Sequence, residues 1–171
     1  MKRKNWILNL LAAAAALAVS VACFLFFQDT EEEKTPAEEV RRLCAERLAA
    51  LGEALRSHTA RHRGRLPDTL EQLVRESGCD PELLSCPAKQ FHYIYIGDGM
   101  SAAELAPETP LVFDRLHNHR MELNVLRADF QTENRTLPPG GTYSTLFGPA
   151  VRADRRLEKR LRLLDRTVFA R

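Results

Sequence analysis

Residues 38–67 have the sequence EEVRRLCAERLAALGEALRSHTARHRGRLP. Within it, apolar residues recur every three or four positions, at Val40, Cys44, Leu48, Leu51 and Leu55. Because an α-helix has 3.6 residues per turn, these side chains share one face, which needs a packing partner. Charged residues occupy most other positions, so we expect one long amphipathic helix. It should end at Gly64, which allows a left-handed exit, and Pro67, which cannot continue the hydrogen-bond ladder.

The segments after this helix predict a small sheet. Asp68 and Glu71 have capping-box spacing, which predicts a short second helix over residues 68–76, ended by Ser77 and Gly78. Strands are expected where β-branched and aromatic residues gather, at residues 91–96, 110–114 and 122–127. Sequential short strands favour an antiparallel meander covered by the long helix. The expected fold class is therefore α+β.

A long apolar segment precedes all of this. Residues 6–27 contain no charged side chain, and a helix of that length spans the hydrocarbon core of a bilayer. Basic residues 2–4 lie before it and acidic residues follow it, so we expect a cytoplasmic N-terminus and an extracytoplasmic main domain. Two alternatives are a lipidated Cys23 and an ordinary cleaved signal peptide. The apolar run of residues 24–27 argues against both, because cleavage would leave it exposed.

Length and charge set the domain organisation. A chain of 171 residues suits one domain with an appendage, and the formal net charge of +2 hides strong segregation. Residues 29–39 carry six acidic side chains against one lysine, whereas residues 152–171 carry eight basic against three acidic ones. We expect an N-terminus and anchor (1–28), an acidic linker (29–37), a folded domain (38–131), and a Pro/Gly linker with a basic C-terminal helix (132–171).

The order of these pieces resembles a known family. Leu84-Ser-Cys-Pro87 precedes the first expected strand, Pro110-Leu-Val-Phe-Asp114 forms the second, and nine residues separate His119 from Asp129. Together with the apolar segment and the long helix, this order is similar to that of pilin-like, type II secretion pseudopilin-like proteins, whose C-terminal part carries a His, nine residues and Asp-Gly. Phe130 stands where the family has that glycine, so we expect the turn after Asp129 not to need a glycine-only conformation.

The resemblance implies a pilin-like fold and a structural role. It implies a single-pass protein of the bacterial inner membrane with a periplasmic domain, non-enzymatic, whose partners are other pilin-like subunits or secretion-machinery proteins. A stand-alone periplasmic ligand- or metal-binding module on the same scaffold is the alternative. Nucleic acid is not an expected partner in that compartment.

The resemblance also suggests which residues hold the domain together. Cys44 and Cys86 match family positions, which suggests a disulfide between the long helix and the following loop. A Cys79–Cys86 disulfide and free thiols remain open, because spacing does not determine connectivity. We expect His119 and Asp129 to be structural, fixing a loop and a turn through backbone hydrogen bonds, since one imidazole and one carboxylate fall short of an active site.

Other candidate ligands form weaker patterns. His117 and His119, with Asp114 or Asp129, have side chains suited to a metal. His58 and His62 share a helix face, but the arginines around them oppose a cation. Three aspartates could supply the oxygen ligands of a calcium site, but their positions do not match a calcium-binding loop; they are Asp98, Asp114 and Asp129. No catalytic triad, phosphate loop or HExxH helix occurs, so the expectation is no enzyme, no cofactor and no metal.

Overall fold

The computed structural model describes residues 36–88, 91–116, 119 and 122–169. The expected anchor over residues 6–27 and most of the acidic linker lie outside the described residues. Among the helices that are described, none is long and apolar enough to cross a membrane.

Helix α2 (Pro36–Arg61) is the long amphipathic helix that the sequence predicts. Four members of its apolar stripe are completely buried, at Cys44, Leu48, Leu51 and Leu55. After the helix, Arg63 and Gly64 both have a positive φ, and the value of +83° at Gly64 confirms the left-handed exit expected there.

The sheet has four antiparallel strands in the order β1-β2-β3-β4. They are β1 (Ile94–Tyr95), β2 (Pro110–Phe113), β3 (Glu122–Arg127) and β4 (Thr132–Thr136). The meander is confirmed, but three expected strands become four, and the first is shorter than expected. The sequence of β4, TENRT, has two threonines but none of the apolar or aromatic residues that mark a half-buried strand. A polar strand is stable there because β4 lies at the sheet edge, where one side faces water.

A tight turn joins β3 to β4. The backbone N–H of Phe130 donates to the carbonyl of Arg127, and the φ of Phe130 is +62°. The turn therefore uses the left-handed region, which glycine favours but a non-glycine residue can also adopt, in keeping with the expectation that it does not need a glycine-only conformation. Tertiary packing holds Phe130 in a conformation that costs a non-glycine residue roughly 1–2 kcal/mol.

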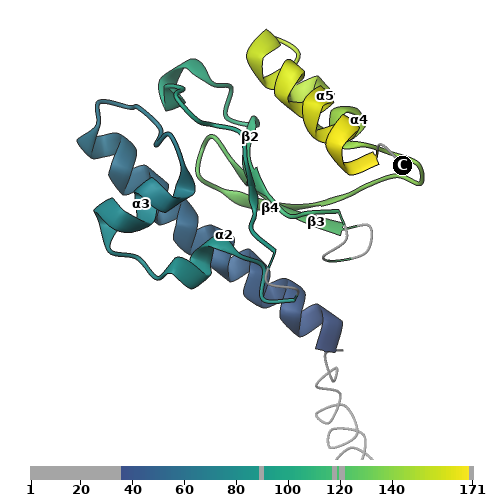
Figure 1. Cartoon of the computed structure of the whole chain (residues 1–171), viewed down its shortest axis with the longest axis horizontal. Coiled ribbons are helices and arrows are strands. Elements are labelled where there is room, and N and C mark those ends of the chain that lie inside the picture. The colour runs from purple at the N-terminus through teal and green to yellow at the C-terminus, as the bar shows by residue number, and fades with distance from the viewer. Residues whose placement is uncertain (1–35, 89–90, 117–118, 120–121, 170–171) are drawn as a thin grey trace, which may run out of the picture. The chain divides into compact units, whose positions relative to one another are not determined.

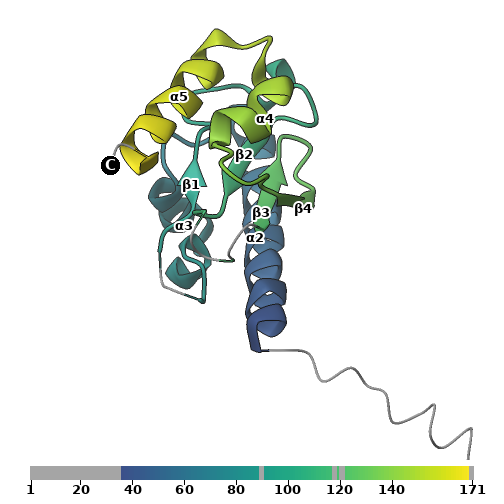
Figure 2. The same ribbon diagram turned by 90° about the vertical axis from the view of Figure 1, so that its right-hand side faces the viewer.

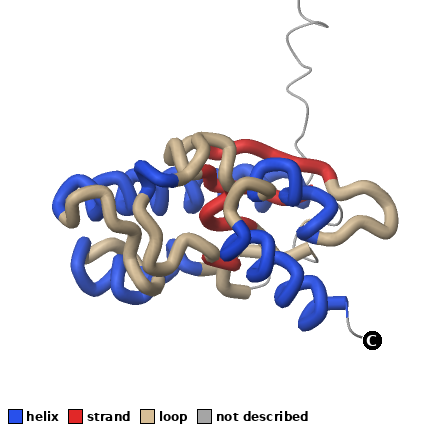
Figure 3. The backbone as a smooth tube through the Cα atoms, turned by 90° about the horizontal axis from the view of Figure 1, so that it is seen from above, coloured by secondary structure: helices blue, strands red, loops and turns tan. Residues whose placement is uncertain are grey.

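Helices cover both faces of the sheet (Figures 1 and 2). Helix α2 packs on β3 and β4, whereas α4 (Tyr143–Val151) packs on β2 from the other side and pairs with α5 (Arg155–Phe169). Figure 3 shows the strands between these helices. All four residues of β2 are accordingly buried, as expected for a strand covered on both faces. The rings of Tyr143 and Phe147 contact Phe113 with centroids 5.2 and 4.8 Å away.

The basic C-terminal helix that the sequence predicts is α5, which begins at Arg155, and the sequence did not predict α4 before it. Residues 152–154 are not helical and separate α4 from α5. There Asp154 accepts a hydrogen bond from the backbone of Arg156 at 2.8 Å and so caps α5. The apolar side of α5 packs inward, with Leu157 and Leu161 buried. Thus β4, α4 and α5, all within residues 132–171, belong to the folded unit.

Three short helices follow α2 in the chain, before the second strand of the sheet. Helix α3 (Leu70–Ser77) begins two residues later than expected, because Thr69 rather than Asp68 caps it by accepting from the backbone of Gln72. It ends at Gly78, whose φ is +66°, as expected. Two 3₁₀ helices follow, η1 (Pro81–Leu84) and η2 (Ala102–Glu104).

Candidate functional site

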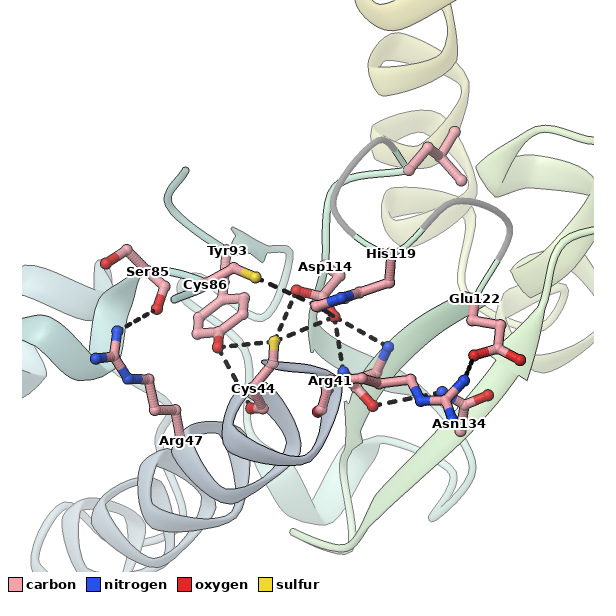
Figure 4. A network of polar contacts seen from close by, with 12 residues as sticks. Arg41, Cys44, Arg47, Ser85, Cys86, Tyr93, Asp114, His119, Glu122 and Asn134 are labelled. Atoms are coloured by element: carbon pink, nitrogen blue, oxygen red, sulfur yellow. Dashed lines mark hydrogen bonds and ion pairs between the residues drawn. The ribbon is translucent and has the colours of Figure 1, made fainter. Parts of the chain in front are cut away.

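Four side chains from four parts of the chain meet at one buried point beside α2. Cys44 comes from α2, Cys86 follows η1, Asp114 follows β2, and His119 lies in the connection to β3. One potential ligand atom from each lies within 4.8 Å of the others. Figure 4 shows these side chains pointing toward one another. We call these four residues the thiol–imidazole cluster.

The contacts within the cluster are short. The thiol of Cys44 donates to Oδ1 of Asp114 at 3.1 Å. Nε2 of His119 lies 3.3 Å from Sγ of Cys86 and 3.4 Å from Oδ2 of Asp114. Both cysteines and the aspartate are completely buried, and the side chain of His119 is 5% exposed. The cluster is therefore shielded from water, and electrostatic interactions within it are strong.

A second layer of polar groups fixes the cluster. The backbone N–H and the side-chain amide of Asn124 each donate to Oδ2 of Asp114 at 3.1 Å. The hydroxyl of Tyr93 lies 3.1 Å from Sγ of Cys44. Such outer contacts hold ligands in a set orientation, as they do around metal centres.

The environment shifts the protonation of all four groups. The interaction of Cys86 with the neighbouring thiol of Cys44 lowers the pKa of Cys86, and the same interaction together with burial raises the pKa of Cys44. Burial raises the pKa of Asp114. Burial lowers the pKa of His119, but its hydrogen bond with Cys86 and the charges of Asp114 and Cys86 outweigh this and raise the pKa. The cluster thus favours a Cys86 thiolate beside a cationic imidazole.

A thiolate beside an imidazole is also the arrangement of a cysteine nucleophile and its base. Here Cys86 is completely buried, which is more typical of a structural cysteine than of a nucleophile. The cluster can instead bond internally, form a disulfide or hold a metal ion. Two sulfurs, one imidazole and one carboxylate are a donor set for four-coordinate zinc.

The structure brings the two cysteines of the expected disulfide together. Cys44 and Cys86 are free thiols here, with sulfurs within 4.8 Å of each other. Cys79 is half-buried and is not a member of the cluster. A Cys44–Cys86 disulfide therefore stays a prediction.

His119 and Asp129 do not share a site. His119 joins the cluster, whereas the carboxylate of Asp129 accepts from the backbone of Gln131 at 3.1 Å and pairs with Arg127 at 2.6 Å. Asp129 thus fixes the β3–β4 turn. His117, the other candidate of that pair, lies outside the described residues.

The three aspartates of the calcium hypothesis have different surroundings. Asp98 pairs with Arg160, Asp129 pairs with Arg127, and Asp114 lies in the cluster. Among the described residues, no group of potential metal ligands contains all three.

His58 and His62 meet a carboxylate that the sequence did not suggest. Oε2 of Glu76 in α3 lies 3.0 Å from Nδ1 of His58 and 3.2 Å from Nε2 of His62. Burial and the neighbouring His62 lower the pKa of His58.

Sequence reasoning named all four members of the thiol–imidazole cluster in two separate pairs, Cys44 with Cys86 and His119 with Asp114, but did not bring the two pairs together. We assigned the cysteines to a disulfide and His119 to a loop, because residues 44, 86, 114 and 119 form no compact motif. One signal was available: Asp114 directly follows an apolar run, and a carboxylate that such a run brings into the core needs polar partners. Comparison of the chain with known protein families, characterised proteins and solved structures finds no match.

Proposed function

We propose that this protein is a membrane-anchored, non-enzymatic metal-binding module on a pilin-like scaffold, and that it holds one zinc ion through Cys44, Cys86, Asp114 and His119. The supporting observation is the convergence of four ligand atoms within 4.8 Å in a buried site. The anchor and the periplasmic location remain the inferences drawn from residues 1–39.

The donor set and its spacing fit zinc. With zinc–ligand bonds of about 2.0–2.3 Å, tetrahedral ligands lie roughly 3.3–3.8 Å apart. The two contacts that involve sulfur, at 3.1 and 3.3 Å, need to lengthen by only a few tenths of an ångström, and the nitrogen–oxygen separation of 3.4 Å already fits. Two thiolates favour zinc over calcium or magnesium, which prefer oxygen ligands.

The charge of a metal ion also suits the site. Two thiolates and a carboxylate would repel one another in a buried, low-dielectric place, and a divalent cation offsets most of that charge. Four protein ligands leave no open position, which is typical of a structural rather than a catalytic zinc site. The ion would join α2 to the loop after η1 and to the end of β2.

The test is a zinc titration of reduced protein, with the stoichiometry and the Co(II) absorption spectrum as readouts. The cluster should bind one equivalent and give the intense visible bands of tetrahedral cobalt thiolate. Cys86→Ser should lose those bands, whereas Cys79→Ser should keep them, because Cys79 lies outside the cluster. Fully reduced protein without cobalt–thiolate bands would refute the proposal.

A second candidate is a structural subunit of a type II secretion or pilus-like assembly. It is favoured by the way α2, which follows the apolar segment, lays its stripe on an antiparallel meander. In this role the partners are pilin-like subunits or secretion-machinery proteins, and the metal or disulfide only stabilises the subunit.

Crosslinking in intact cells separates the two candidates. An assembly subunit should give a ladder of higher species that disappears when residues 1–28 are replaced by a cleavable signal peptide. A metal-binding module should give a single species with either N-terminus, and a ladder that depends on the apolar segment would favour assembly.

A further inference from the structure

A second group of ligands lies where α2 ends against α3. His58 and His62 are four residues apart on α2, and Glu76 comes from the last turn of α3. Both histidines approach the same carboxylate oxygen, at 3.0 and 3.2 Å, and the three ligand atoms lie within 4.8 Å of one another. None of the three belongs to the thiol–imidazole cluster.

The geometry differs from that of an ordinary histidine–carboxylate hydrogen bond. Nδ1 of His58 is buried and has no hydrogen-bond partner of normal geometry, although Oε2 of Glu76 lies 3.0 Å away. That oxygen therefore lies off the direction in which the ring nitrogen bonds. Two ligands of one metal ion lie close together in the same way without a hydrogen bond between them, because the lone pair of each points at the ion and not at the other ligand. A buried polar atom without a partner otherwise needs an explanation.

The two imidazoles are arranged side by side. Their rings stack with centroids 4.1 Å apart and an angle of 15° between planes. Nitrogen–oxygen distances of 3.0 and 3.2 Å are close to the roughly 3.3 Å expected between tetrahedral ligands with bonds of about 2.0–2.1 Å. Histidines at i and i+4 on one helix are a known arrangement for holding zinc.

A neighbouring side chain orients the carboxylate. Nε2 of Gln72 donates to Oε1 of Glu76 at 2.8 Å, which leaves Oε2 for the histidines. The other end of that amide, Oε1 of Gln72, accepts from the backbone of Asp68. Outer contacts of this kind are typical of metal ligands.

The arginines nearby oppose a cation less than the sequence suggested. Arg61 donates to the carbonyl of Ser57, Arg56 pairs with Glu53, and Arg65 pairs with Asp68 at 3.8 Å. Carboxylates offset the charges of Arg56 and Arg65, whereas Arg61 donates to a neutral carbonyl and its charge still acts on His58 and Glu76. Glu76 contributes a negative charge among the ligands. The side chains of His62 and Glu76 are 44% and 33% exposed, so an ion can enter from solvent.

We propose that His58, His62 and Glu76 form a second metal site, which takes a divalent transition ion with affinity for imidazole, Zn²⁺ or Cu²⁺, and completes its coordination with water. Two imidazoles and one carboxylate with an open position match such ions. The bound ion clamps α3 to the end of α2. This site contains no thiol, so unlike the thiol–imidazole cluster it keeps its ligands when the cysteines are oxidised.

The test is calorimetric titration of the reduced full chain in detergent with ZnCl₂. The wild type should bind two equivalents and His62→Ala one, because a half-exposed histidine can be removed without loss of the core. His92→Ala is the matched control: His92 is exposed on a different segment, and its removal should leave both equivalents. Glu76→Gln, which keeps the size of the side chain, should weaken the second site at least tenfold.

The outcomes separate the two sites. If the thiol–imidazole cluster holds no zinc, the wild type binds one equivalent, and that equivalent still disappears in His62→Ala. Electron paramagnetic resonance of the copper-loaded protein should show coupling to two nitrogens that is lost in the same variant. An equal stoichiometry in wild type and His62→Ala, or an equal loss in His62→Ala and His92→Ala, overturns the proposal.

Discussion

Gly52 lies in the middle of α2 where the helix presses on the β3–β4 turn, so replacing it with alanine should destabilise the domain. An added Cβ would lie 2.8 Å from Cδ1 of Leu126 and 3.2 Å from the carbonyl oxygen of Phe130. Carbon atoms in good contact are about 3.5–4.0 Å apart, so the first distance is a clash. Neither neighbour can retreat easily, because Leu126 is completely buried and the Phe130 backbone belongs to a hydrogen-bonded turn.

Two effects of opposite sign decide the magnitude. In a helix interior, alanine is about 0.8–1.0 kcal/mol more favourable than glycine. Overpacking a filled core typically costs about 1–3 kcal/mol. We therefore expect a net destabilisation of roughly 1 kcal/mol, which lowers the melting temperature of a domain of this size by about 3–5 °C.

A double-mutant cycle read by chemical denaturation tests the cause. Leu126→Ala removes the clashing methyl groups, so in that background Gly52→Ala should become neutral or stabilising. The coupling between the two sites should be about 1–3 kcal/mol. Ala49→Gly, on the exposed side of the same helix, measures the propensity term alone. If Gly52→Ala stabilises the wild type by as much as Ala49→Gly destabilises it, then an added Cβ at position 52 does not clash, and the inferred close packing of α2 on the sheet is wrong.

Three further predictions concern the core, a helix cap and the cysteines. Leu51→Ala should cost about 2–5 kcal/mol in thermal unfolding because Leu51 is completely buried, whereas Leu163→Ala should cost less than about 1 kcal/mol because Leu163 is 60% exposed; equal costs would contradict the burial pattern. A hydrogen bond from Arg156 lowers the pKa of Asp154, so its cap contributes above the unfolded pKa near 4 and is lost as pH falls through the folded value. At pH 7 Asp154→Ala should therefore cost about 0.5–2 kcal/mol and Asp154→Asn much less, and the difference in unfolding free energy between wild type and Asp154→Ala should shrink as pH falls through the lowered pKa of Asp154. Diamide should take two electrons and two protons from Cys44 and Cys86, join them in a disulfide and release one equivalent of zinc to a chromogenic chelator; retention of that zinc after complete thiol loss would contradict the assignment.

Local patterns were sufficient for much of the fold. The stripe of α2 and the ends at Gly64 and Gly78 follow from helix periodicity and from glycine chemistry, which depend on residues close together in the chain. The three apolar strands follow from composition in the same way. The residues at which elements begin were predicted less accurately. Helix α3, for example, is capped by Thr69 and not by Asp68, because both neighbouring residues offer an oxygen acceptor.

The long-range part of the site was not accessible from the chain alone. Cys44 and His119 are 75 positions apart, and nothing near either residue indicates that they meet. The same holds for Glu76, which gives the histidines of α2 a carboxylate from another helix. Without a motif, each of these side chains has a simpler explanation as a core cysteine, a loop histidine or a solvated acid.

By itself, the sequence determined an apolar N-terminal segment, an α+β domain led by an amphipathic helix and a basic, amphipathic C-terminal region, because each depends on the spacing of similar residues along a few turns or one strand. Only the tertiary structure decided that TENRT is a strand, that Phe130 takes a left-handed turn, and that two thiols, an imidazole and a carboxylate share one buried point. The physical reason is common to all three: their energy comes from partners distant in the chain, a paired edge, a packed turn and shared polar contacts, and these partners exist only once α2 lies on the sheet.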